Sequence, residues 1–416
     1  MKHSTLTSSS HHVLIAGAGI GGLVTALSLL HRGIDCDVYE QAPELREVGA
    51  GLWISANGAR VLCELGLEQE LEEAAIGAAE RAIRLWNSGE KWPLYEAGAS
   101  APTHKPYLLL RAHLLRMLMV AVQRLKPDAI HLNARCSGFA EVDGKVILKL
   151  EDSTEAVGTA LVGADGIHSR IREEAFGPIK SHYTNALAWR GLVPVDRLAA
   201  HQRKHAVYTW VGPAAHVTVY PVRWQDTELL TFSAQVEYSD WQLESWSIKG
   251  DVADCLKDFE GWHPDILEMI TNVDTLHKWG IFVREPLKQW SKGRVTLLGD
   301  ACHSMVPYLG QGVNMAIEDA CVLSRFLEMN PADPAEAFSL YQNERQERAE
   351  KTAQRAAEMQ AIFHNKALAS RETAGDYILS QWGPAQNAAR YNWIYEYDAT
   401  SADLQAGPRD LARAEA

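Results

Sequence analysis

The sequence predicts an α/β protein, in which a Rossmann-like, mostly parallel sheet is interrupted by a second, mostly antiparallel sheet and followed by C-terminal helices. Three observations support this prediction. An apolar strand at residues 13–16 runs directly into a glycine-rich loop and a helical pattern. A second short apolar strand, at residues 295–298, leads into another loop and helix. Between residues 186 and 283 helical periodicity fades, and strand-like runs rich in Trp, Tyr, Val and Thr replace it.

The composition is typical of a soluble globular protein, with 47% hydrophobic and 22% charged residues in a chain of 416, long enough for two domains that share a core. The formal net charge of −13 disfavours a nucleic acid or an anionic membrane as partner. An acidic ligand would therefore have to meet local arginines or backbone amides.

The cysteines and the chain start suggest where the protein acts. Six cysteines without a CxxC pair predict neither a metal site nor a dithiol centre, and reduced thiols agree with a cytoplasmic protein. Residues 1–11 form a loose tail without the apolar core of a signal peptide, and no apolar run reaches transmembrane length.

The first glycine loop, from Gly17 to Gly22, has the sequence GAGIGG and lies between a strand and a helix. In a dinucleotide site of this order, Gly17 allows the tight turn, Gly19 lets a pyrophosphate approach the helix N-terminus, and Gly22 permits close helix-to-strand packing. A second strand at residues 36–39 presents Glu40, whose carboxylate can accept hydrogen bonds from a ribose diol. The alternative is a glycine-rich turn whose acid is surface charge.

Two further polar residues follow predicted strands. Arg111 opens a helix at residues 111–125 directly after an apolar strand, where it can pair with a phosphate or a ribose. Asp165 follows the strand at residues 159–163 in a Gly-Ala-Asp-Gly loop at the same sheet edge. The alternatives are a solvated arginine at a helix start and an aspartate that caps the helix beginning near His168.

The second sheet is predicted from strand-like runs at residues 188–193, 206–211, 216–222 and 228–236. In the third run, polar side chains that include His216 and Tyr220 share one face, and two valines share the other. His216 and Tyr220 would be about 13 Å apart, so that they could flank a small ring without bonding each other. Packing of a half-buried sheet explains the same pattern.

Residues 293–320 combine a strand, a carboxylate and a helix start. Asp300 lies at the C-terminal end of the strand, where α/β sheets bind ligands. Gly310 and Gly312 lie at the start of a helix that continues from Val313. Amide donors and the helix dipole favour negative charge there, and glycine lets a planar ligand approach the backbone. The stretch predicts a partly anionic cofactor; an ordinary strand, loop and helix is the alternative.

These elements predict a discontinuous first domain, at residues 12–185 and 284–330, with the β-rich domain inserted at residues 186–283. The tail of residues 1–11 precedes them, and a helical region of residues 331–416 follows. The long helix of that region is predicted mainly as a solvated face, with a narrow apolar stripe that packs on the core or on a second subunit.

Three motifs stand in order along residues 12–330: GAGIGG with Glu40, the loop around Asp165, and Gly-Asp at 299–300 followed by Pro307 and a GQG sequence at 310–312. Together they resemble the single-component FAD-dependent aromatic hydroxylases, the para-hydroxybenzoate hydroxylase-like flavoprotein monooxygenases. The phrases GDACH at 299–303 and AIEDA at 316–320 are similar to those of salicylate, 3-hydroxybenzoate and 6-hydroxynicotinate hydroxylases. The resemblance implies an FAD-binding domain of the glutathione reductase type with an inserted substrate domain.

The resemblance also implies how FAD would lie on this chain. The pyrophosphate would lie on the first glycine loop, the adenosine ribose on Glu40 and the ribityl chain on Asp300. Arg111 would lie near the ribose-phosphate part, and Asp165 at the pyrophosphate and nicotinamide side. The flavin pyrimidine edge would face the later helix start, whose dipole stabilises anionic reduced flavin. The predicted cofactor residues are Gly17, Gly19, Gly22, Glu40, Gln41, Arg111, Asp165, Asp300, Gly310, Gln311, Gly312, Val313 and Asn314.

The implied reaction is hydroxylation of a small hydroxylated aromatic acid, such as a salicylate or a hydroxybenzoate. NADH or NADPH would reduce FAD, dioxygen would add at the flavin C4a position, and the hydroperoxide would deliver oxygen to the ring. No second GxGxxG motif follows the first, which agrees with a nicotinamide cofactor that binds only transiently. The expected partners are the aromatic substrate, dioxygen and NAD(P)H, and the chain would be a monomer or a homodimer.

The candidate catalytic residues are His216, Tyr220 and Tyr308, because histidine takes a phenolic proton near neutral pH and tyrosine relays or donates one. Alternatives are a structural histidine at His216 and an arginine at a sheet edge for Arg190, which otherwise suits a substrate carboxylate. Trp53 and Tyr308 stand where some pyridine-ring hydroxylases have His, which favours a phenolic or bulkier aromatic over 6-hydroxynicotinate. The predicted substrate contacts are Trp53, Arg190, His216, Tyr220, Pro307 and Tyr308.

Two other functions stay open from the sequence. An epoxidase or N-hydroxylase of the same fold would act on a larger neutral substrate. A non-catalytic regulatory protein would bind flavin without turnover.

Overall fold

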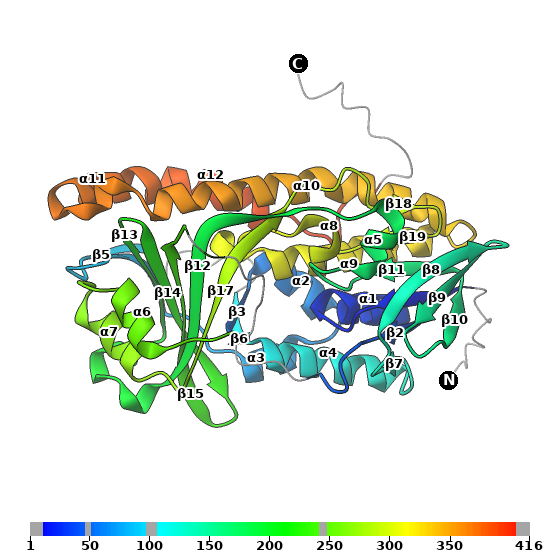
Figure 1. Ribbon diagram of the computed structural model, residues 1–416, viewed down its shortest axis with the longest axis horizontal. Helices are drawn as coiled ribbons and strands as arrows, with labels where there is room; N and C mark the ends of the chain where they lie inside the picture. Colours follow the sequence, from blue (N-terminus) through cyan, green and yellow to red (C-terminus); the bar gives the residue numbers. More distant parts are fainter. Residues whose placement is uncertain (1–10, 46–50, 97–105, 240, 242–247, 405–416) are drawn as a thin grey trace, which may run out of the picture.

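The first sheet of the computed structural model has six strands in the order β18-β19-β11-β1-β2-β7, and all but the edge strand β18 run parallel (Figure 1). The strands are β1 (His12–Ala16), β2 (Asp35–Tyr39), β7 (Ile130–His131), β11 (Ala160–Gly163), β18 (Ser291–Lys292) and β19 (Val295–Leu297). The helices that pack in its core include α1 (Ile20–His31), α4 (Arg111–Leu125) and α9 (Gly312–Met329). The predicted Rossmann-like arrangement is thus confirmed.

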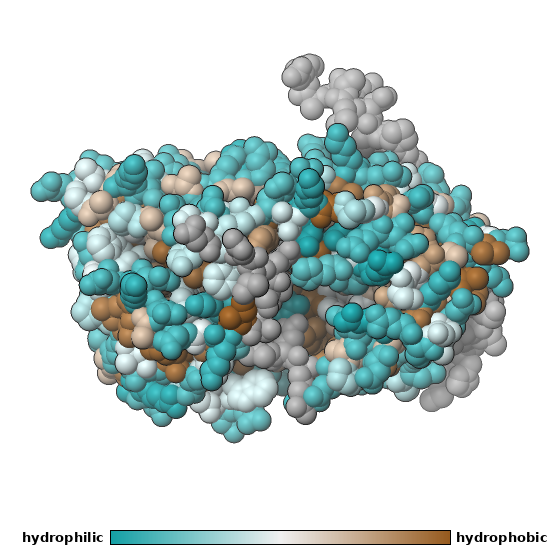
Figure 2. Space-filling model, in the orientation of Figure 1, coloured by the Kyte–Doolittle hydropathy of each residue, from teal (hydrophilic) through white to brown (hydrophobic). Residues whose placement is uncertain are grey.

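The structure describes residues 11–45, 51–96, 106–239, 241 and 248–404. The predicted tail of residues 1–11 lies outside the described residues except for its last one, as do residues 405–416 of the predicted C-terminal region. Among the described helices, none is both long and apolar enough to cross a membrane. On the face drawn in Figure 2, hydrophilic side chains cover most of the coloured surface.

Two small sheets and several short helices complete this half of the molecule. One sheet consists of β8 (Cys136–Val142), β9 (Lys145–Leu150) and β10 (Glu155–Gly158), and the other of β3 (Gly51–Ile54) and β6 (Tyr107–Leu110). The short helices are α2 (Ala56–Glu64), α3 (Glu68–Ala74), α5 (Arg170–Phe176), α8 (Asp300–His303) and the 3₁₀ turn η3 (Pro307–Leu309).

A second sheet of eight strands has the order β16-β17-β12-β15-β14-β13-β4-β5, in which only β13 and β4 run parallel. Its strands are β4 (Glu80–Leu85), β5 (Lys91–Glu96), β12 (Ser181–Pro194), β13 (Ala206–Gly212), β14 (Ala215–Trp224), β15 (Thr227–Glu237), β16 (Ile248–Lys249) and β17 (Thr275–Arg284).

This sheet reaches beyond the predicted range of residues 186–283. The strands β4 and β5 join it from residues 80–96, and β12 begins at Ser181. β4 buries Ala82, Ile83 and Leu85 in the register with β13, so that the edge of the inserted sheet is covered by a much earlier part of the chain. The large sheet therefore combines strands from the predicted first domain with those of the predicted insertion. The division of the chain into domains stays a prediction.

The two faces of the large sheet pack against different helices. One face carries Trp189, Val217 and Phe232 and packs on α6 (Val252–Asp258) and α7 (Pro264–Thr271). The other face packs on the C-terminal helices (Figure 1). The remaining elements are α10 (Pro334–Phe363), α11 (Arg371–Trp382), α12 (Pro384–Tyr395) and the 3₁₀ turns η1 (Val195–Arg197), η2 (Ala200–Gln202) and η4 (Lys366–Ala369).

Helix α10 connects the two halves of the molecule. Its first turns bury Phe338 and Tyr341 in the core of the parallel sheet, and its last turns bury Met359 and Phe363 against the large sheet. In Figure 1 it runs as a long orange ribbon past both sheets. The predicted apolar stripe is therefore core along the whole helix, and only the opposite face is solvated.

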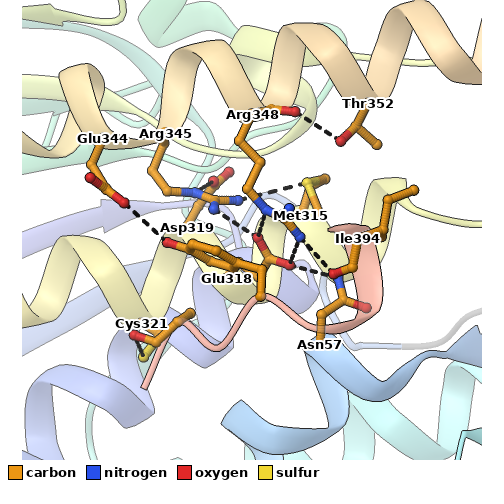
Figure 3. A network of polar contacts seen from close by, with 12 residues as sticks. Asn57, Met315, Glu318, Asp319, Cys321, Glu344, Arg345, Arg348, Thr352 and Ile394 are labelled. Carbon is orange, nitrogen blue, oxygen red and sulfur yellow. Dashed lines mark hydrogen bonds and ion pairs between the residues drawn. The ribbon is translucent and has the colours of Figure 1, made fainter. Parts of the chain in front are cut away.

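Helices α9 and α10 are joined by a buried cluster of charges (Figure 3). Arg345 Nε lies 2.8 Å from Asp319 Oδ1, and Arg345 Nη1 lies 2.7 Å from Glu318 Oε2. Arg348 donates two hydrogen bonds of 2.8 Å to the Glu318 carboxylate. The side chains of Glu318, Asp319 and Arg345 have no solvent exposure, so that each charge is neutralised inside the protein.

The carboxylates of Glu318 and Asp319 also bond to α2 and to the loop that follows β19. His303 Nε2 lies 2.5 Å from Asp319 Oδ2, which also accepts from the backbone N–H of Gly299 at 3.2 Å. Asn57 donates to Glu318 at 2.6 Å. Burial alone would raise the pKa of both carboxyl groups, but the cations beside them hold each pKa below its ordinary value.

Removing one cation from this cluster should destabilise the fold strongly. In Arg345→Met two buried carboxylates lose a partner, and we expect the free energy of unfolding to fall by about 3–5 kcal/mol in chemical denaturation. Arg355→Met is the matched control, because Arg355 lies on the same helix and pairs with Glu358 at the surface. It should cost less than about 1 kcal/mol. Similar small losses in both variants would show that the cluster does not stabilise the fold.

The loss should depend on pH. Since the pKa values of Glu318 and Asp319 are lowered from 4.5 and 3.8, their stabilising contribution is fully present above those values. It is lost as pH falls through the lowered values. Because loss of Arg345 raises the same two pKa values in the folded variant, the stability difference between the wild type and Arg345→Met should be largest near neutrality and shrink as the pH falls into the acidic range. Denaturation curves over this range measure it, and a difference that grows in acid would contradict the assignment.

Candidate active site

The first glycine loop has the geometry of a phosphate cradle. Gly17 has a φ of 101°, and a Cβ on Gly22 would lie 2.0 Å from the Gly17 carbonyl oxygen, so both positions require glycine. A Cβ on Gly19 would meet no atom within 4 Å, because Gly19 borders the cavity described below. The α1 N-terminus has no side-chain cap and no acidic residue in its first turn. Its amide donors thus face a space that suits an anion.

The side chain of Glu40 fixes the first glycine loop by hydrogen bonds. Its carboxylate accepts hydrogen bonds from the backbone N–H groups of Ala18 at 2.8 Å and Ala42 at 2.9 Å. The predicted contact of Glu40 with a ribose stays a prediction, and the structure adds that the same side chain fixes the loop. The neighbouring Gln41 is exposed.

Asp165 uses its carboxylate within its own loop. It accepts hydrogen bonds from Ser169 Oγ at 2.5 Å and from the backbone N–H groups of Arg170 at 2.7 Å and Ile171 at 3.1 Å. These contacts match the alternative in which Asp165 caps a helix, here α5. Its neighbours Ala164 and Gly166 line the cavity. The predicted cofactor role of Asp165 therefore rests on its loop and not on its side-chain contacts.

Asp300 lies just after the C-terminal end of the strand β19, as predicted. Its side chain is exposed and borders the cavity. Desolvation by the surrounding protein raises the pKa of this carboxyl, while the charges of His303 and Arg111 act in the opposite direction. Arg111 lines the same cavity. A carboxylate and a guanidinium group thus flank the space between the two glycine-bearing loops.

The start of α9 supplies a second set of amide donors. Gly310 ends η3 with a φ of 63°, and Gly310, Gly312 and Val313 line the cavity. α9 also lacks a side-chain cap and an acidic residue in its first turn. Its positive end is therefore open to an anionic or electron-rich ring.

The side chains of Gln311 and Asn314 are buried and serve the frame of this site. Gln311 accepts from Asn57 at 3.1 Å and donates to Ser55 at 3.0 Å. Asn314 accepts from the backbone N–H of Ser55 at 3.1 Å and donates to the carbonyl oxygen of Trp53 at 3.1 Å. Their side chains hold the turn between β3 and α2 against the helix start, which leaves the helix backbone as the part that would face a cofactor.

A cavity of about 390 Å³ extends from these loops to the large sheet. It is bordered by every predicted substrate contact, and the polar face of β14 and β15 forms one wall. As predicted, Val217 and Val219 of β14 point to the opposite, apolar face. The predicted substrate contacts on the cavity are Trp53, Arg190, His216, Tyr220, Pro307 and Tyr308.

Arg190 lies in the middle of the sheet and not at an edge, since β12 pairs with β17 on one side and with β15 on the other. Its guanidinium carbon lies 4.5 Å from the centre of the Trp279 ring. Burial lowers the pKa of Arg190, although an arginine stays charged at neutral pH. The sheet-edge alternative for this residue is therefore wrong, and a half-buried cation borders the cavity.

His216 and Tyr308 lie next to each other, with ring centres 5.3 Å apart in an edge-on arrangement. Burial lowers the pKa of His216 well below 6.5, so the imidazole is neutral at pH 7. Burial raises the pKa of Tyr220 to about 12 and that of Tyr308 further, so both hydroxyls stay protonated. The cavity wall therefore offers a neutral base at His216 and protonated hydroxyls at Tyr220 and Tyr308, of which that of Tyr308 donates to Gln360 at 3.4 Å.

Sequence reasoning missed several cavity residues. Arg81 of β4 lies with its guanidinium carbon 4.9 Å from the centre of the Trp53 ring and 5.4 Å from that of Tyr391. Tyr391 and Tyr395 reach the cavity from α12, a region without any chemical motif. Gln235 of β15 borders the cavity beside His216 in the register of the sheet. No local pattern marks these residues, because only the sheet pairing brings them to the site.

Comparison with known proteins relates the whole chain to FAD-binding enzymes. A family model described as an FAD binding domain matches residues 10–356. A 3-amino-4-hydroxybenzoate 2-monooxygenase of Streptomyces platensis is 37% identical over 396 residues, which cover 94% of this chain and 98% of the relative. A 6-hydroxynicotinate 3-monooxygenase of Bordetella bronchiseptica is 31% identical over 402 residues, which cover 96% and 98%.

Among solved structures, that of Klebsiella pneumoniae HpxO in complex with FAD and uric acid is similar along the whole chain. It has a TM-score of 0.79 and 27% sequence identity, and the match covers 97% of this chain and 100% of that one. Both the parallel sheet and the large sheet thus belong to one known architecture.

Fold, glycine cradle and relatives together define a flavoprotein oxidoreductase. The chain belongs to the para-hydroxybenzoate hydroxylase-like family of FAD-binding monooxygenases. It is an FAD-dependent aromatic monooxygenase, and FAD is its cofactor. The predicted family, fold class and cofactor are confirmed, and the alternative of a non-catalytic flavin-binding protein is set aside.

Loss of the Asp300 carboxylate should weaken FAD binding. If Asp300 holds a ribityl hydroxyl, Asp300→Ala loses a charged hydrogen bond of about 1.5–3 kcal/mol, and the dissociation constant of FAD should rise about ten- to a hundredfold. Flavin fluorescence titration of the FAD-free protein measures this. Asp254→Ala is the control, since this exposed carboxylate of α6 lies outside the cavity. Normal FAD retention in Asp300→Ala would remove Asp300 from the cofactor site.

Proposed function

We propose that the substrate is a small aromatic carboxylic acid with a ring hydroxyl, of the salicylate or hydroxybenzoate type, and that its ring is hydroxylated. One observation supports this more than any other. A half-buried guanidinium group, a neutral imidazole and a phenol lie on one wall of the cavity, as Arg190, His216 and Tyr220. A carboxylate and a ring hydroxyl are the groups that such a wall would bind.

The names of the relatives point to the same class of substrate. The Streptomyces platensis protein is named for 3-amino-4-hydroxybenzoate and the Bordetella bronchiseptica protein for 6-hydroxynicotinate. Both compounds are aromatic acids with a hydroxyl group on the ring. We extend this class, though not either compound, to the present chain.

The residues of the chain supply binding, orientation and proton transfer. When bound, FAD supplies the electron transfer from NAD(P)H and the activation of dioxygen that ring hydroxylation requires, with the second oxygen atom leaving as water. The amide donors at the α9 start stabilise negative charge on the cofactor ring. Arg190 fixes the substrate carboxylate, and His216 takes the proton of the ring hydroxyl, which makes the ring electron-rich.

The remaining wall keeps water away from the reacting ring. Trp53 of β3, Phe363 at the end of α10 and Tyr391 of α12 contribute aromatic faces to the cavity. A dry cavity strengthens the pairing of Arg190 with a carboxylate and protects the activated oxygen from wasteful loss.

An assay of NAD(P)H oxidation with a panel of aromatic compounds tests this function. Hydroxybenzoates, aminobenzoates and hydroxypyridines are compared, and products are identified by mass spectrometry. We expect a ring-hydroxylated product from at least one hydroxylated aromatic acid. An epoxide or an N-hydroxylated product from a neutral compound, without turnover of any acid, would favour the epoxidase or N-hydroxylase instead.

Replacing Arg190 should discriminate between an acid and its decarboxylated analogue. In Arg190→Met the KM for the acid should rise about ten- to a hundredfold, since a charged hydrogen bond contributes about 1.5–3 kcal/mol. The KM for the corresponding phenol, which lacks the carboxylate, should change little. Arg197→Met serves as control, because Arg197 pairs with Asp274 at the surface. An equal effect on acid and phenol would show that Arg190 does not bind the carboxylate.

A further inference from the structure

A chain of three titratable side chains leads from the cavity to the surface. His216 Nδ1 lies 2.7 Å from His364 Nε2, and His364 Nδ1 lies 3.2 Å from Glu237 Oε1. His216 comes from β14, His364 from the residue that ends α10, and Glu237 from the last position of β15. Two consecutive strands and the end of a much later helix thus form one continuous row of hydrogen bonds.

Two of these side chains are buried, and the third is exposed. His216 borders the cavity and is 2% exposed, the His364 side chain is 1% exposed, and the Glu237 side chain is 48% exposed. The row therefore has one end at the substrate wall, a dry middle and one end in solvent. Two buried imidazoles in contact are costly to place unless their hydrogen bonds are made, so the arrangement needs a reason beyond packing.

The direction of the hydrogen bonds follows from Glu237. An ionised carboxylate only accepts, so His364 donates from Nδ1. Burial outweighs the attraction of Glu237 at His364 and lowers its pKa, and His216 is neutral as well. A neutral imidazole has one N–H, so His364 Nε2 accepts and His216 Nδ1 donates. The nitrogen that is left on His216, Nε2, carries a lone pair.

Other side chains surround the two histidine rings without taking part in the hydrogen bonds between His216, His364 and Glu237. Tyr308 is edge-on to His216, and its hydroxyl donates to Gln360 at 3.4 Å. Phe363 packs with its ring centre 4.5 Å from that of His216. Gln235 borders the cavity next to His216 and donates to Ser233 at 2.8 Å. None of these contacts interrupts the bonds between the two histidines and Glu237.

We propose that His216, His364 and Glu237 form a proton relay that carries the ring-hydroxyl proton of the bound substrate to solvent, and returns one when the product forms. The proposal rests on the proposed function, because it needs a substrate with an ionisable ring hydroxyl. His216 is the group that meets the substrate, whereas His364 and Glu237 act through it.

The transfer is balanced and moves no electrons. The substrate O–H bond breaks as a bond forms to His216 Nε2, the Nδ1 proton of His216 passes to His364 Nε2, and the Nδ1 proton of His364 passes to Glu237 and then to water. One proton leaves the cavity and both imidazoles end as the other neutral tautomer. Reprotonation of the product oxygen runs the same steps backwards and restores the first tautomers. Neither imidazole has to hold a positive charge in the dry interior, which its lowered pKa would oppose.

The test uses the FAD-bound enzyme and 4-hydroxy-3-nitrobenzoate, an aromatic acid whose phenolate is seen by its absorbance. Without NAD(P)H no turnover takes place, and stopped-flow mixing at a pH where the free probe is mostly protonated follows its ionisation on the enzyme. In Glu237→Gln and in His364→Gln, hydrogen bonding remains possible but proton transfer does not. We expect ionisation to slow about ten- to a hundredfold in both variants.

Glu228→Gln is the matched control. Glu228 lies on the same strand as Glu237 and pairs with an imidazole, that of His205, at 3.1 Å, but this pair is at the surface and away from the cavity. The bound probe should ionise at the same rate in Glu228→Gln as in the wild type. Binding of 3-nitrobenzoate, which has no hydroxyl, should be the same in all variants, and added formate should restore part of the rate in Glu237→Ala.

Three results would overturn the relay. These are equal ionisation rates in Glu237→Gln and Glu228→Gln, a slower rate that is matched by lost binding of 3-nitrobenzoate, and a wild type that leaves the bound probe protonated. Failure of the proposed function is distinct: ionisation would respond to Glu237→Gln while no aromatic acid is hydroxylated in the turnover assay.

Discussion

Two adjacent carboxylates of α9, Glu318 and Asp319, are fully buried and are held there by Arg345 and Arg348 of α10. Burying an ion costs several kcal/mol unless its partner is placed well. A shift of α9 by one residue would turn both carboxylates away from their cations, so the register of the two helices is fixed. Because His303 bonds Asp319, the loop that carries Asp300 is fixed with them. The charge cluster thus sets the distance between the start of α9, which is predicted to face the flavin, and the carboxylate of Asp300.

The same helix α10 links this cluster to the substrate wall. Its first half packs in the core of the parallel sheet, and its end packs against the large sheet and supplies Phe363 to the cavity and His364 to the row behind it. The predicted cofactor loops and the proposed substrate wall belong to different sheets, yet α10 packs against both sheets and fixes their relative position. Catalysis that depends on placing a ring against a cofactor within fractions of an ångström needs such a frame.

The sequence was sufficient where a function depends on local spacing. The glycine cradle, the strand-end Asp300 and the alternating face of His216 and Tyr220 follow from residues close to one another in the chain, and the structure places each where the pattern indicates. Roles that depend on distant partners were out of reach. Nothing local shows that the acids of the AIEDA phrase meet Arg345, or that β4 closes the sheet beside β13. The hydrogen bonds of Glu40 to the glycine loop and of His216 to His364 likewise join residues that are far apart in the sequence.

Charge at the site runs against the charge of the chain as a whole. The formal net charge is −13, which at long range repels an anion, but salt screens such interactions beyond about 8 Å at physiological ionic strength. At closer range the cavity is lined by Arg81, Arg111 and Arg190, and Asp300 is the one carboxylate that lines it among the described residues. If Asp300 bonds a ribityl hydroxyl, the field that an incoming acid meets is positive. A half-buried cation beside a cavity discriminates by desolvation as well, because a bound neutral ligand covers it without a counter-charge, whereas a carboxylate provides one. The proposed preference for acids would follow from the same low-dielectric wall that keeps His216 neutral, since desolvation both strengthens a pairing of Arg190 with a carboxylate and disfavours a charged imidazole.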